Sequence, residues 1–219
     1  MNTRARKLRQ KPIRISYEEF RTAASAAACC AGTGGDTTTT LATMAARQLT
    51  GTKPAEMLEE LLGGQEGMPV CGVWHHALAG EILLLCLKNA RYQIGDDLID
   101  EVVERGRLIP GGACGFMGVC GALNSTTSAY AILLGSTPVA TEARERLLRF
   151  SSRLAARLVE IGGSRCCKKS TYAALELAQG EFAKLGFELP GEEFAGRCKF
   201  FADNETCDGA ECVYFPRKS

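Results

Sequence analysis

The chain has 219 residues, of which 46% are hydrophobic, and its formal net charge is +1. A chain of this length and composition can bury a core of its own, so we expect one domain that folds without disulfide staples. The near-zero net charge excludes a general electrostatic attraction to nucleic acid or membranes, and any such attraction must be local.

The eleven cysteines are the most unusual feature of the composition. The basic N-terminal segment lacks the apolar run of a signal peptide, so we expect a cytoplasmic protein with reduced thiols. No stretch reaches the roughly 20 apolar residues of a membrane helix, because the longest candidate, residues 77–90, contains Glu81 and Lys88. The thiols are therefore candidates for metal ligands, redox groups or core residues.

Helix signals follow one another along the chain, and strand signals are scarce. A capping box at Ser16 and Glu19, a first-turn Pro54 and a capping Thr141 mark helix starts, and glycines mark helix ends. The pattern predicts helices over residues 16–30, 36–49, 54–64, 74–90, 96–104, 125–134, 141–161 and 170–185. The predicted class is all-α, a single-domain helical bundle with an irregular cysteine-rich C-terminal tail.

We divide the chain into three parts on this pattern. Residues 1–50 are expected to form an N-terminal extension that is basic, then helical, and partly flexible. Residues 51–190 are expected to form the helical core domain. Residues 191–219 are expected to form a metal-binding tail packed on that core.

The tail contains three cysteines spaced nine and five positions apart, Cys198, Cys207 and Cys212. This spacing in a turn-rich segment allows a loop to fold around one ion or cluster. The alternative is three unrelated cysteines in a mobile tail.

A glycine-rich stretch surrounds Cys114 and Cys120. Gly115, Gly118 and Gly121 recur every three residues, which would clear one side of a helix for a neighbouring backbone or a cofactor. We therefore predict the two thiols as metal ligands and the three glycines as cofactor-binding positions. Tight packing between helices is the alternative explanation.

Two adjacent cysteines, Cys166 and Cys167, are flanked by Arg165, Lys168 and Lys169. Nearby cations favour the thiolate form, which is both the ligand and the nucleophile. We predict Cys166 as a metal ligand, Cys167 as a reactive catalytic thiol and Lys168 as a cofactor-binding residue. Two cysteines that are merely buried are the alternative.

The only two histidines, His75 and His76, follow Cys71 and Trp74. Consecutive helical residues point about 100° apart, so both imidazoles can face one site only at a helix start or a bend. We predict both histidines as catalytic groups that transfer protons. A structural role in the core is the alternative.

The order and separation of the HH, PGGACGFMGVCGA, GGSRCCKKSTY and C-terminal CxF…NxxCxGxxC blocks resemble a cysteine-rich domain family of unknown function. That family occurs in anaerobic bacteria and methanogenic archaea, sometimes fused to S-adenosylmethionine-dependent enzymes. The glycine-flanked cysteines are more weakly similar to redox iron–sulfur proteins with a C-G-C-A-x-x-G signature. Relatives tend to have histidine where this chain has Cys71.

A thiolate-rich ligand set selects an iron–sulfur cluster or zinc over magnesium or calcium. We favour an iron–sulfur cluster of the 4Fe-4S type because the chain has no CxxC knuckle, and zinc is the alternative. The expected function is redox or sulfur-transfer chemistry of anaerobic metabolism, with a partner enzyme or redox protein.

A second function remains open for one helix face. Four arginines fall on one side of the predicted helix over residues 141–161, namely Arg146, Arg149, Arg153 and Arg157. A zinc-stabilised interaction module could bind tRNA or a partner enzyme through this face. A solvated face without a partner is the alternative.

Overall fold

A computed structural model describes residues 34–64 and 71–217. The helix predicted over residues 16–30 lies outside this part of the chain, as do Cys29 and Cys30. The described residues form an all-α fold, as predicted, and contain no β-strand. Its α-helices are α2 (Gly34–Ala46), α3 (Pro54–Gly63), α4 (His75–Asn89), α5 (Asp96–Arg107), α6 (Ala113–Phe116), α7 (Gly121–Leu134), α8 (Thr141–Ile161) and α9 (Cys167–Ala183), and a 3₁₀ turn, η2, spans Gly209–Glu211.

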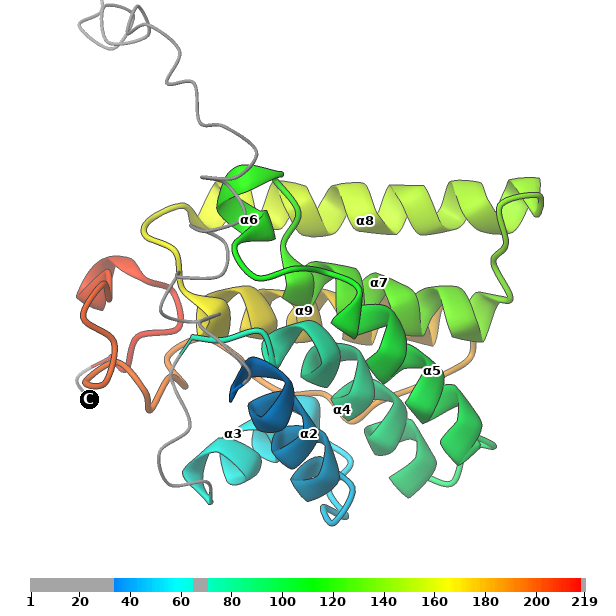
Figure 1. Ribbon diagram of the computed structural model, residues 1–219, viewed down its shortest axis with the longest axis horizontal. Helices are drawn as coiled ribbons and strands as arrows, with labels where there is room; N and C mark the ends of the chain where they lie inside the picture. Colours follow the sequence, from blue (N-terminus) through cyan, green and yellow to red (C-terminus); the bar gives the residue numbers. More distant parts are fainter. Residues whose placement is uncertain (1–33, 65–70, 218–219) are drawn as a thin grey trace, which may run out of the picture.

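Helix α4 lies at the centre of the bundle, where it contacts α2, α3, α5, α7 and α9 (Figure 1). Every residue from Ala77 to Leu87 is buried, because apolar side chains lie on all sides of this segment and Glu81 is its one charged residue. Gly80 allows α7 to come close, and its amide donates a hydrogen bond to Ser125 Oγ at 2.8 Å. The close packing of α4 against its neighbours fixes the position of its first residues, the two histidines.

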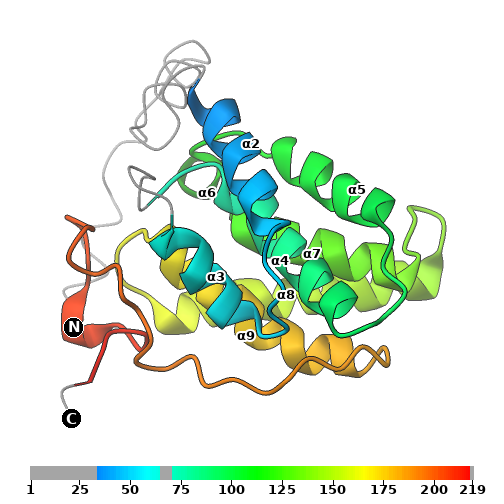
Figure 2. The same ribbon diagram turned by 90° about the horizontal axis from the view of Figure 1, so that it is seen from below.

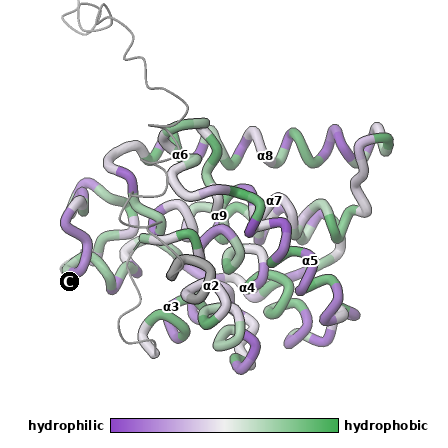
Figure 3. The backbone as a smooth tube through the Cα atoms, in the orientation of Figure 1, coloured by the Kyte–Doolittle hydropathy of each residue, from purple (hydrophilic) through white to green (hydrophobic). Residues whose placement is uncertain are grey.

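Helix α8 forms an outer layer over α7 and α9. Only Phe150 and Leu154 of this helix are fully buried, and hydrophilic and hydrophobic residues alternate along it (Figure 3). The Phe150 ring packs against Tyr130 of α7 with ring centroids 4.8 Å apart. Throughout the described segments, no helix combines the length and apolarity needed to cross a membrane.

The first residues of α4, α7 and α9 meet at one end of the bundle. His75, Gly121 and Cys167 begin these three helices, and all three residues line the same cavity. Figure 1 shows the start of α9 beside the C-terminal segment at this end, with α6 above it. Because helix N-termini carry partial positive charge, this end of the bundle favours anionic groups.

The segment after α9 runs back along that helix to its first turn (Figure 2). Phe194 and Tyr214 of this segment are buried, and the Tyr214 hydroxyl donates a hydrogen bond to Glu176 at 2.9 Å. The amides of Gly196 and Cys198 donate to the carbonyls of Val213 and Tyr214 at 3.0 and 2.8 Å. This return path carries the tail cysteines to the start of α9.

Several helix boundaries differ from the predicted ones, among them the start of α7 at Gly121 rather than residue 125, and two of the differences have a local cause. Helix α9 begins at Cys167, three residues before the predicted Ser170, because the Cys166 sulfur caps it by accepting the Lys169 amide. Helix α5 continues to Arg107 although Gly106 was expected to end it. A Cβ at Gly106 would lie 2.1 Å from the His76 carbonyl oxygen, so this glycine allows close packing between helices.

Glu81 is a buried carboxyl group in the middle of α4. Its Oε1 accepts a hydrogen bond from Arg47 Nε at 3.2 Å, and its Oε2 has no partner within the described structure. Burial raises the pKa of Glu81 to about 8, and the Arg47 ion pair only partly opposes this effect. The folded protein therefore holds a proton on Glu81 at pH values where the unfolded chain has released it.

Stability should accordingly fall as pH rises from the unfolded pKa of Glu81 to its folded pKa. We expect wild type to lose about 2 kcal/mol of unfolding free energy between about pH 6 and pH 8 through this group. The Glu81→Gln variant should lack this loss in urea unfolding, whereas Glu101→Gln, an exposed control, should keep it. An unchanged pH slope in Glu81→Gln would contradict the assignment.

Candidate functional site

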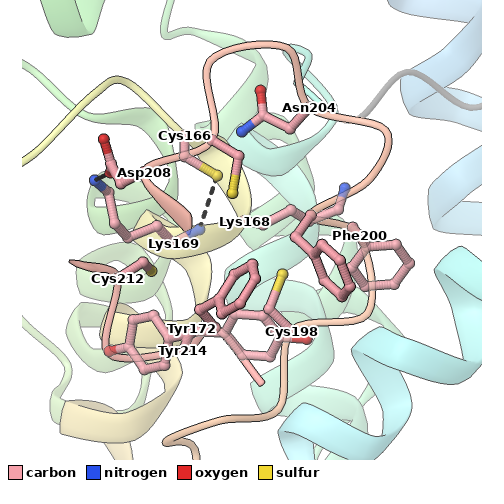
Figure 4. A pocket seen from close by; sticks show the side chains of 13 residues that line it. Cys166, Lys168, Lys169, Tyr172, Cys198, Phe200, Asn204, Asp208, Cys212 and Tyr214 are labelled. Atoms are coloured by element: carbon pink, nitrogen blue, oxygen red, sulfur yellow. Dashed lines mark hydrogen bonds and ion pairs between the residues drawn. The ribbon is translucent and has the colours of Figure 1, made fainter. Parts of the chain in front are cut away.

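Four cysteines line one small cavity between the start of α9 and the C-terminal segment, which we call the first cavity. Its volume is about 20 Å³, room for about one water-sized group. Figure 4 shows Cys166, Cys198 and Cys212 with their sulfur atoms turned toward the space between them. The thiols that line the first cavity belong to Cys166, Cys198, Cys207 and Cys212.

Local hydrogen bonds place each of these thiols. Cys166 is the N-cap of α9, and the Cys198 amide pairs with the segment around Tyr214. The Cys207 amide donates to the Asn204 carbonyl at 3.0 Å, and the Cys212 amide donates to Gly209 in η2, also at 3.0 Å. The turns predicted from the composition of the tail therefore hold three thiols around the fourth.

Three of the four sulfur atoms accept hydrogen bonds from backbone amides. The Lys169 amide donates to Cys166 Sγ at 3.5 Å, and the Gly209 amide donates to Cys207 Sγ at 3.4 Å. The Phe200 amide donates to the Cys198 sulfur and opposes the effect of burial, which raises the pKa of that thiol. Amide donors of this kind stabilise the thiolate form that binds metals.

Lys168 brings a buried positive charge to the first cavity. Its side chain is 2% exposed, and Nζ lies 4.1 Å from the centre of the Trp74 ring and 5.2 Å from that of Phe200. Burial lowers the pKa of Lys168 to about 8, and negative charge on Cys71, Cys167, Cys166 and Cys198 opposes this lowering. A charged Lys168 is therefore favoured by thiolates around it.

Lys169 holds the tail against α9 beside the same cavity. Its Nζ donates to Asp208 at 2.7 Å and to the Gly162 carbonyl at 2.6 Å. The side chain of Lys169 thus links the start of α9 to the residue after Cys207.

A larger cavity of about 180 Å³ adjoins the first one, and we call it the second cavity. Its wall includes the N-terminal residues of α4, α7 and α9, the loop before α9, and Arg165. Cys166 lines both cavities, so the two share a wall. The predicted site residues in the wall of the second cavity are His75, His76, Cys114, Cys120, Gly121, Cys166 and Cys167.

His75 is buried, and both of its ring nitrogens have hydrogen-bond partners. Its Nδ1 lies 3.0 Å from the Gly72 carbonyl oxygen, so this nitrogen carries the proton and donates it. Its Nε2 lies 3.4 Å from Lys168 Nζ and accepts from the ammonium. Burial and then the charge on Lys168 lower the pKa of His75, which keeps the imidazole neutral. This arrangement orients Lys168.

His76 is less buried, and its Nδ1 donates to the Ile109 carbonyl at 2.9 Å. Burial lowers the pKa of His76, so it too is neutral near pH 7. A Cβ at Gly121 would overlap the imidazole at 1.9 Å from Cδ2, so this glycine makes room for the ring. A backbone acceptor at Nδ1 leaves Nε2 as the nitrogen for ligation or proton transfer.

The other two glycines of the motif lie on separate elements. Gly115 is in the one-turn helix α6, and Gly118 has a φ of +68° in the turn before α7. A Cβ at either position would meet no atom within 4 Å. The expected stripe along one helix is therefore wrong, because the chain turns between Gly115 and Gly121.

Sequence reasoning did not include Cys71 among the site residues. The structure places Cys71 beside Cys166 and Cys167, whose thiols donate hydrogen bonds to its sulfur and lower its pKa. The same bonds raise the pKa values of Cys166 and Cys167. The sequence feature that could have identified Cys71 as a site residue is its position just before the histidine pair.

None of the nine cysteines of the described residues forms a disulfide. Cys86 is the one placed in the hydrophobic core, where its sulfur lies 3.1 Å from Met57 Sδ. Within residues 34–64 and 71–217, no three His, Cys, Asp or Glu side chains are arranged to hold a metal ion as they stand. A single ion in the first cavity would therefore require its four sulfur atoms to move closer together.

The arginine row on α8 is accompanied by glutamates. Arg149 pairs with Glu145, Arg153 with Glu181, and Arg157 with Glu176 and Glu160. The row also includes Arg146. Because the glutamates offset part of its charge, this face carries less net positive charge than four arginines alone would give it. Binding of tRNA or a partner enzyme through this face stays a prediction.

Comparison with known proteins gives a family but no function. The model of a family of unknown function, DUF5714, matches residues 42–215. Neither the curated proteins nor the solved structures contain a match to this chain.

Proposed function

The chain belongs to DUF5714, a family of unknown function, and we propose that it is an iron–sulfur protein acting in redox or sulfur-transfer chemistry. The observation that carries this proposal is the first cavity. It gathers four thiols that are up to 46 positions apart in the chain, from Cys166 to Cys212. Among the described residues, one cysteine, Cys86, is fully buried in the core, whereas the first cavity brings four thiols together.

The surroundings of the first cavity fit an anionic metal–thiolate group. Backbone amides donate to three of the sulfur atoms, and α9 begins at the cavity with its positive end. Hydrogen bonds to the sulfur atoms and nearby charge also tune the potential of such clusters. Lys168 would offset part of the negative charge of the bound group.

The donor set determines which groups can bind. Four thiolates select iron–sulfur clusters or zinc over magnesium or calcium. A cluster at Cys166, Cys198, Cys207 and Cys212 would supply one-electron chemistry or a source of sulfide. Cys114 and Cys120 line the second cavity instead, so they are separate from this ligand set.

Metal and sulfide analysis of anaerobically purified protein tests the proposal. We expect a brown protein that contains iron and acid-labile sulfide. A Cys198→Ser, Cys212→Ser double variant should lose most of both, because two of the four ligands are gone. The Cys86→Ala variant should keep them, since Cys86 is a core thiol remote from the cavity.

A Cys114→Ser, Cys120→Ser variant locates the metal further. If the first cavity holds the group, this variant should keep its iron and sulfide. Loss of iron in this variant and its retention in the tail variant would contradict the proposed ligand set.

Structural zinc is the second candidate, and the small volume of the first cavity favours it. A space of about 20 Å³ suits one ion better than a four-iron cluster unless the walls move. Zinc would then hold the tail in shape, and the protein would be an interaction module. Colourless protein with stoichiometric zinc and no sulfide would establish this alternative and overturn the iron–sulfur proposal.

A further inference from the structure

The chain between α5 and α7 contacts the imidazole of His76 at two places. Near its start, the Ile109 carbonyl accepts a hydrogen bond from Nδ1 at 2.9 Å. At its end, Gly121 lies so close to the ring that a Cβ there would be 2.4 Å from Nε2. The segment between these two contacts contains Cys114 and Cys120. Both cysteines are therefore carried by a loop that is anchored on one histidine.

A turn closes this loop between its two cysteines. The Val119 amide donates a hydrogen bond to the Ala113 carbonyl at 3.2 Å. Cys114 follows one partner of this bond and Cys120 follows the other, so the bond holds the two cysteines near each other. Both cysteines line the second cavity together with His76.

These three side chains supply the donor types that zinc prefers. Because Nδ1 of His76 donates to a carbonyl, its Nε2 carries the lone pair that a metal ion can bind. Cys120 is the N-cap residue of α7, yet its side chain makes no capping hydrogen bond, unlike that of Cys166 in α9. Two thiolates and one imidazole form the ligand set of a zinc site that keeps a fourth position open.

The loop has to shift for the three donors to close on one ion. No three donors of the described segments are arranged to hold a metal as they stand. Residues 114–118 are all exposed, and a Cβ at Gly115 or Gly118 would meet no described atom within 4 Å. The segment around Cys114 is therefore loosely packed, whereas His76 is fixed in the first turn of the central helix α4. An ion bound at Nε2 would draw this segment toward the imidazole.

We propose that His76, Cys114 and Cys120 form a zinc site, separate from the first cavity, whose fourth coordination position opens into the second cavity. Two thiolates balance the charge of Zn²⁺, so the site can accept a further small anion such as a thiolate or a carboxylate. Arg165 and the N-termini of α7 and α9 lie in the same wall and favour negative charge. The volume of about 180 Å³ exceeds what one water needs, so it admits such a ligand.

Cobalt(II) is the probe, because it replaces zinc in such sites and reports thiolate ligands in its absorption spectrum. The Cys198→Ser, Cys212→Ser variant lacks two thiols of the first cavity, and its full chain is prepared reduced and free of metal as the background. We expect it to bind one Co²⁺ per chain, with a thiolate-to-cobalt charge-transfer band. X-ray absorption of its zinc form should show two sulfur and two lighter ligands. A failure to bind cobalt, or a shell of three or four sulfur atoms, would overturn the proposal.

Substitutions in this background assign the ligands. Adding Cys114→Ser and Cys120→Ser should abolish the charge-transfer band, and adding His76→Gln should weaken cobalt binding by about tenfold or more. Ser170→Ala changes another residue of the same wall and should leave cobalt binding unchanged. Unchanged binding in the folded cysteine or histidine variant, verified by circular dichroism, would overturn the assignment. X-ray absorption of the background decides the ligand set even if a substitution unfolds the chain.

Mercaptoacetate, a small anionic thiol, tests the open position. It should shift the charge-transfer band of the background at concentrations about tenfold lower than cysteamine, which is cationic. A band that mercaptoacetate leaves unmoved would overturn the open position.

The zinc site and the group in the first cavity have separate readouts. In the otherwise unchanged protein, Cys114→Ser with Cys120→Ser should remove zinc and keep iron and sulfide. If the iron–sulfur proposal fails, the cobalt and X-ray absorption results stand, because the background already lacks two of the thiols that the first cavity would use. Zinc that the Cys114→Ser, Cys120→Ser variant retains would overturn the second site.

Discussion

Replacing Gly106 with alanine is expected to destabilise the protein by about 2–3 kcal/mol through overpacking. The new Cβ would lie 2.1 Å from the His76 carbonyl oxygen and 2.7 Å from Ala77 Cα. Both are backbone atoms of α4, so no side chain can rotate away. Helices α5 and α4 would have to separate, and the backbone that carries His76 into the second cavity would move with them. Urea unfolding measures the loss.

Gly180→Ala is the matched control for this effect. Gly180 is an exposed glycine inside α9, and a Cβ there would meet nothing within 4 Å. Alanine should stabilise that helix by about 1 kcal/mol. If the two variants unfolded at the same urea concentration, helix propensity would dominate and the close α4–α5 contact would be wrong.

Glu59→Ala should release the C-terminal segment from the bundle and cost about 3–5 kcal/mol, as breaking a buried ion pair does. Glu59 is 7% exposed at its side chain and accepts hydrogen bonds from Arg197 at both carboxylate oxygens, at 2.8 and 3.2 Å. Tyr172 and Lys199 donate to the same carboxylate at 3.3 and 3.2 Å. Its loss leaves Arg197 without its main partner next to the first cavity.

Limited proteolysis together with metal analysis measures this release. We expect cleavage within residues 190–217 and loss of bound metal in Glu59→Ala, with the helical content retained. Glu56→Ala is the control, because Glu56 is an exposed residue of the same helix that pairs with Lys53. Equal protease resistance of the two variants would show that Glu59 does not hold the tail.

The helices most completely predicted are those whose signals are local. Pro54 and Gly64 mark the two ends of α3. The apolar periodicity of residues 141–161 predicts α8 with the same bounds that the structure has. Local chemistry decides these elements, so the sequence suffices. The start of α9 was missed because a cysteine is not among the usual capping residues, and Cys166 caps it through sulfur.

The glycines show why some packing escapes sequence reasoning. From the sequence alone, Gly106 is expected to end a helix. In the structure it instead allows α5 to pack closely against the backbone of α4. From the sequence alone, Gly121 is expected to belong to a stripe of glycines along one helix. In the structure it makes room for the imidazole of His76, which lies 45 positions earlier in the chain. Both roles depend on a partner helix that periodicity does not identify.

The candidate site was partly predictable. The sequence predicted the tail cysteines as ligands of one ion or cluster and left open whether they share it with Cys114, Cys120 and Cys166; the structure places the tail cysteines and Cys166 around one cavity. Their separation from Cys114 and Cys120 into adjoining cavities was not predictable, because it depends on how α6, α7 and α9 meet. The lowering of the Cys71 pKa by Cys166 and Cys167 also depends on distant segments that only the fold brings together.

The return path of the C-terminal segment sets an order for biosynthesis. Three of the four thiols in the first cavity follow α9 in the chain, and the last of them is Cys212. Helices α2–α9 can therefore emerge from the ribosome and collapse before the fourth sulfur atom is available. If the first cavity holds the proposed inorganic group, its incorporation is a late maturation step, because Cys212 follows α9 in the chain.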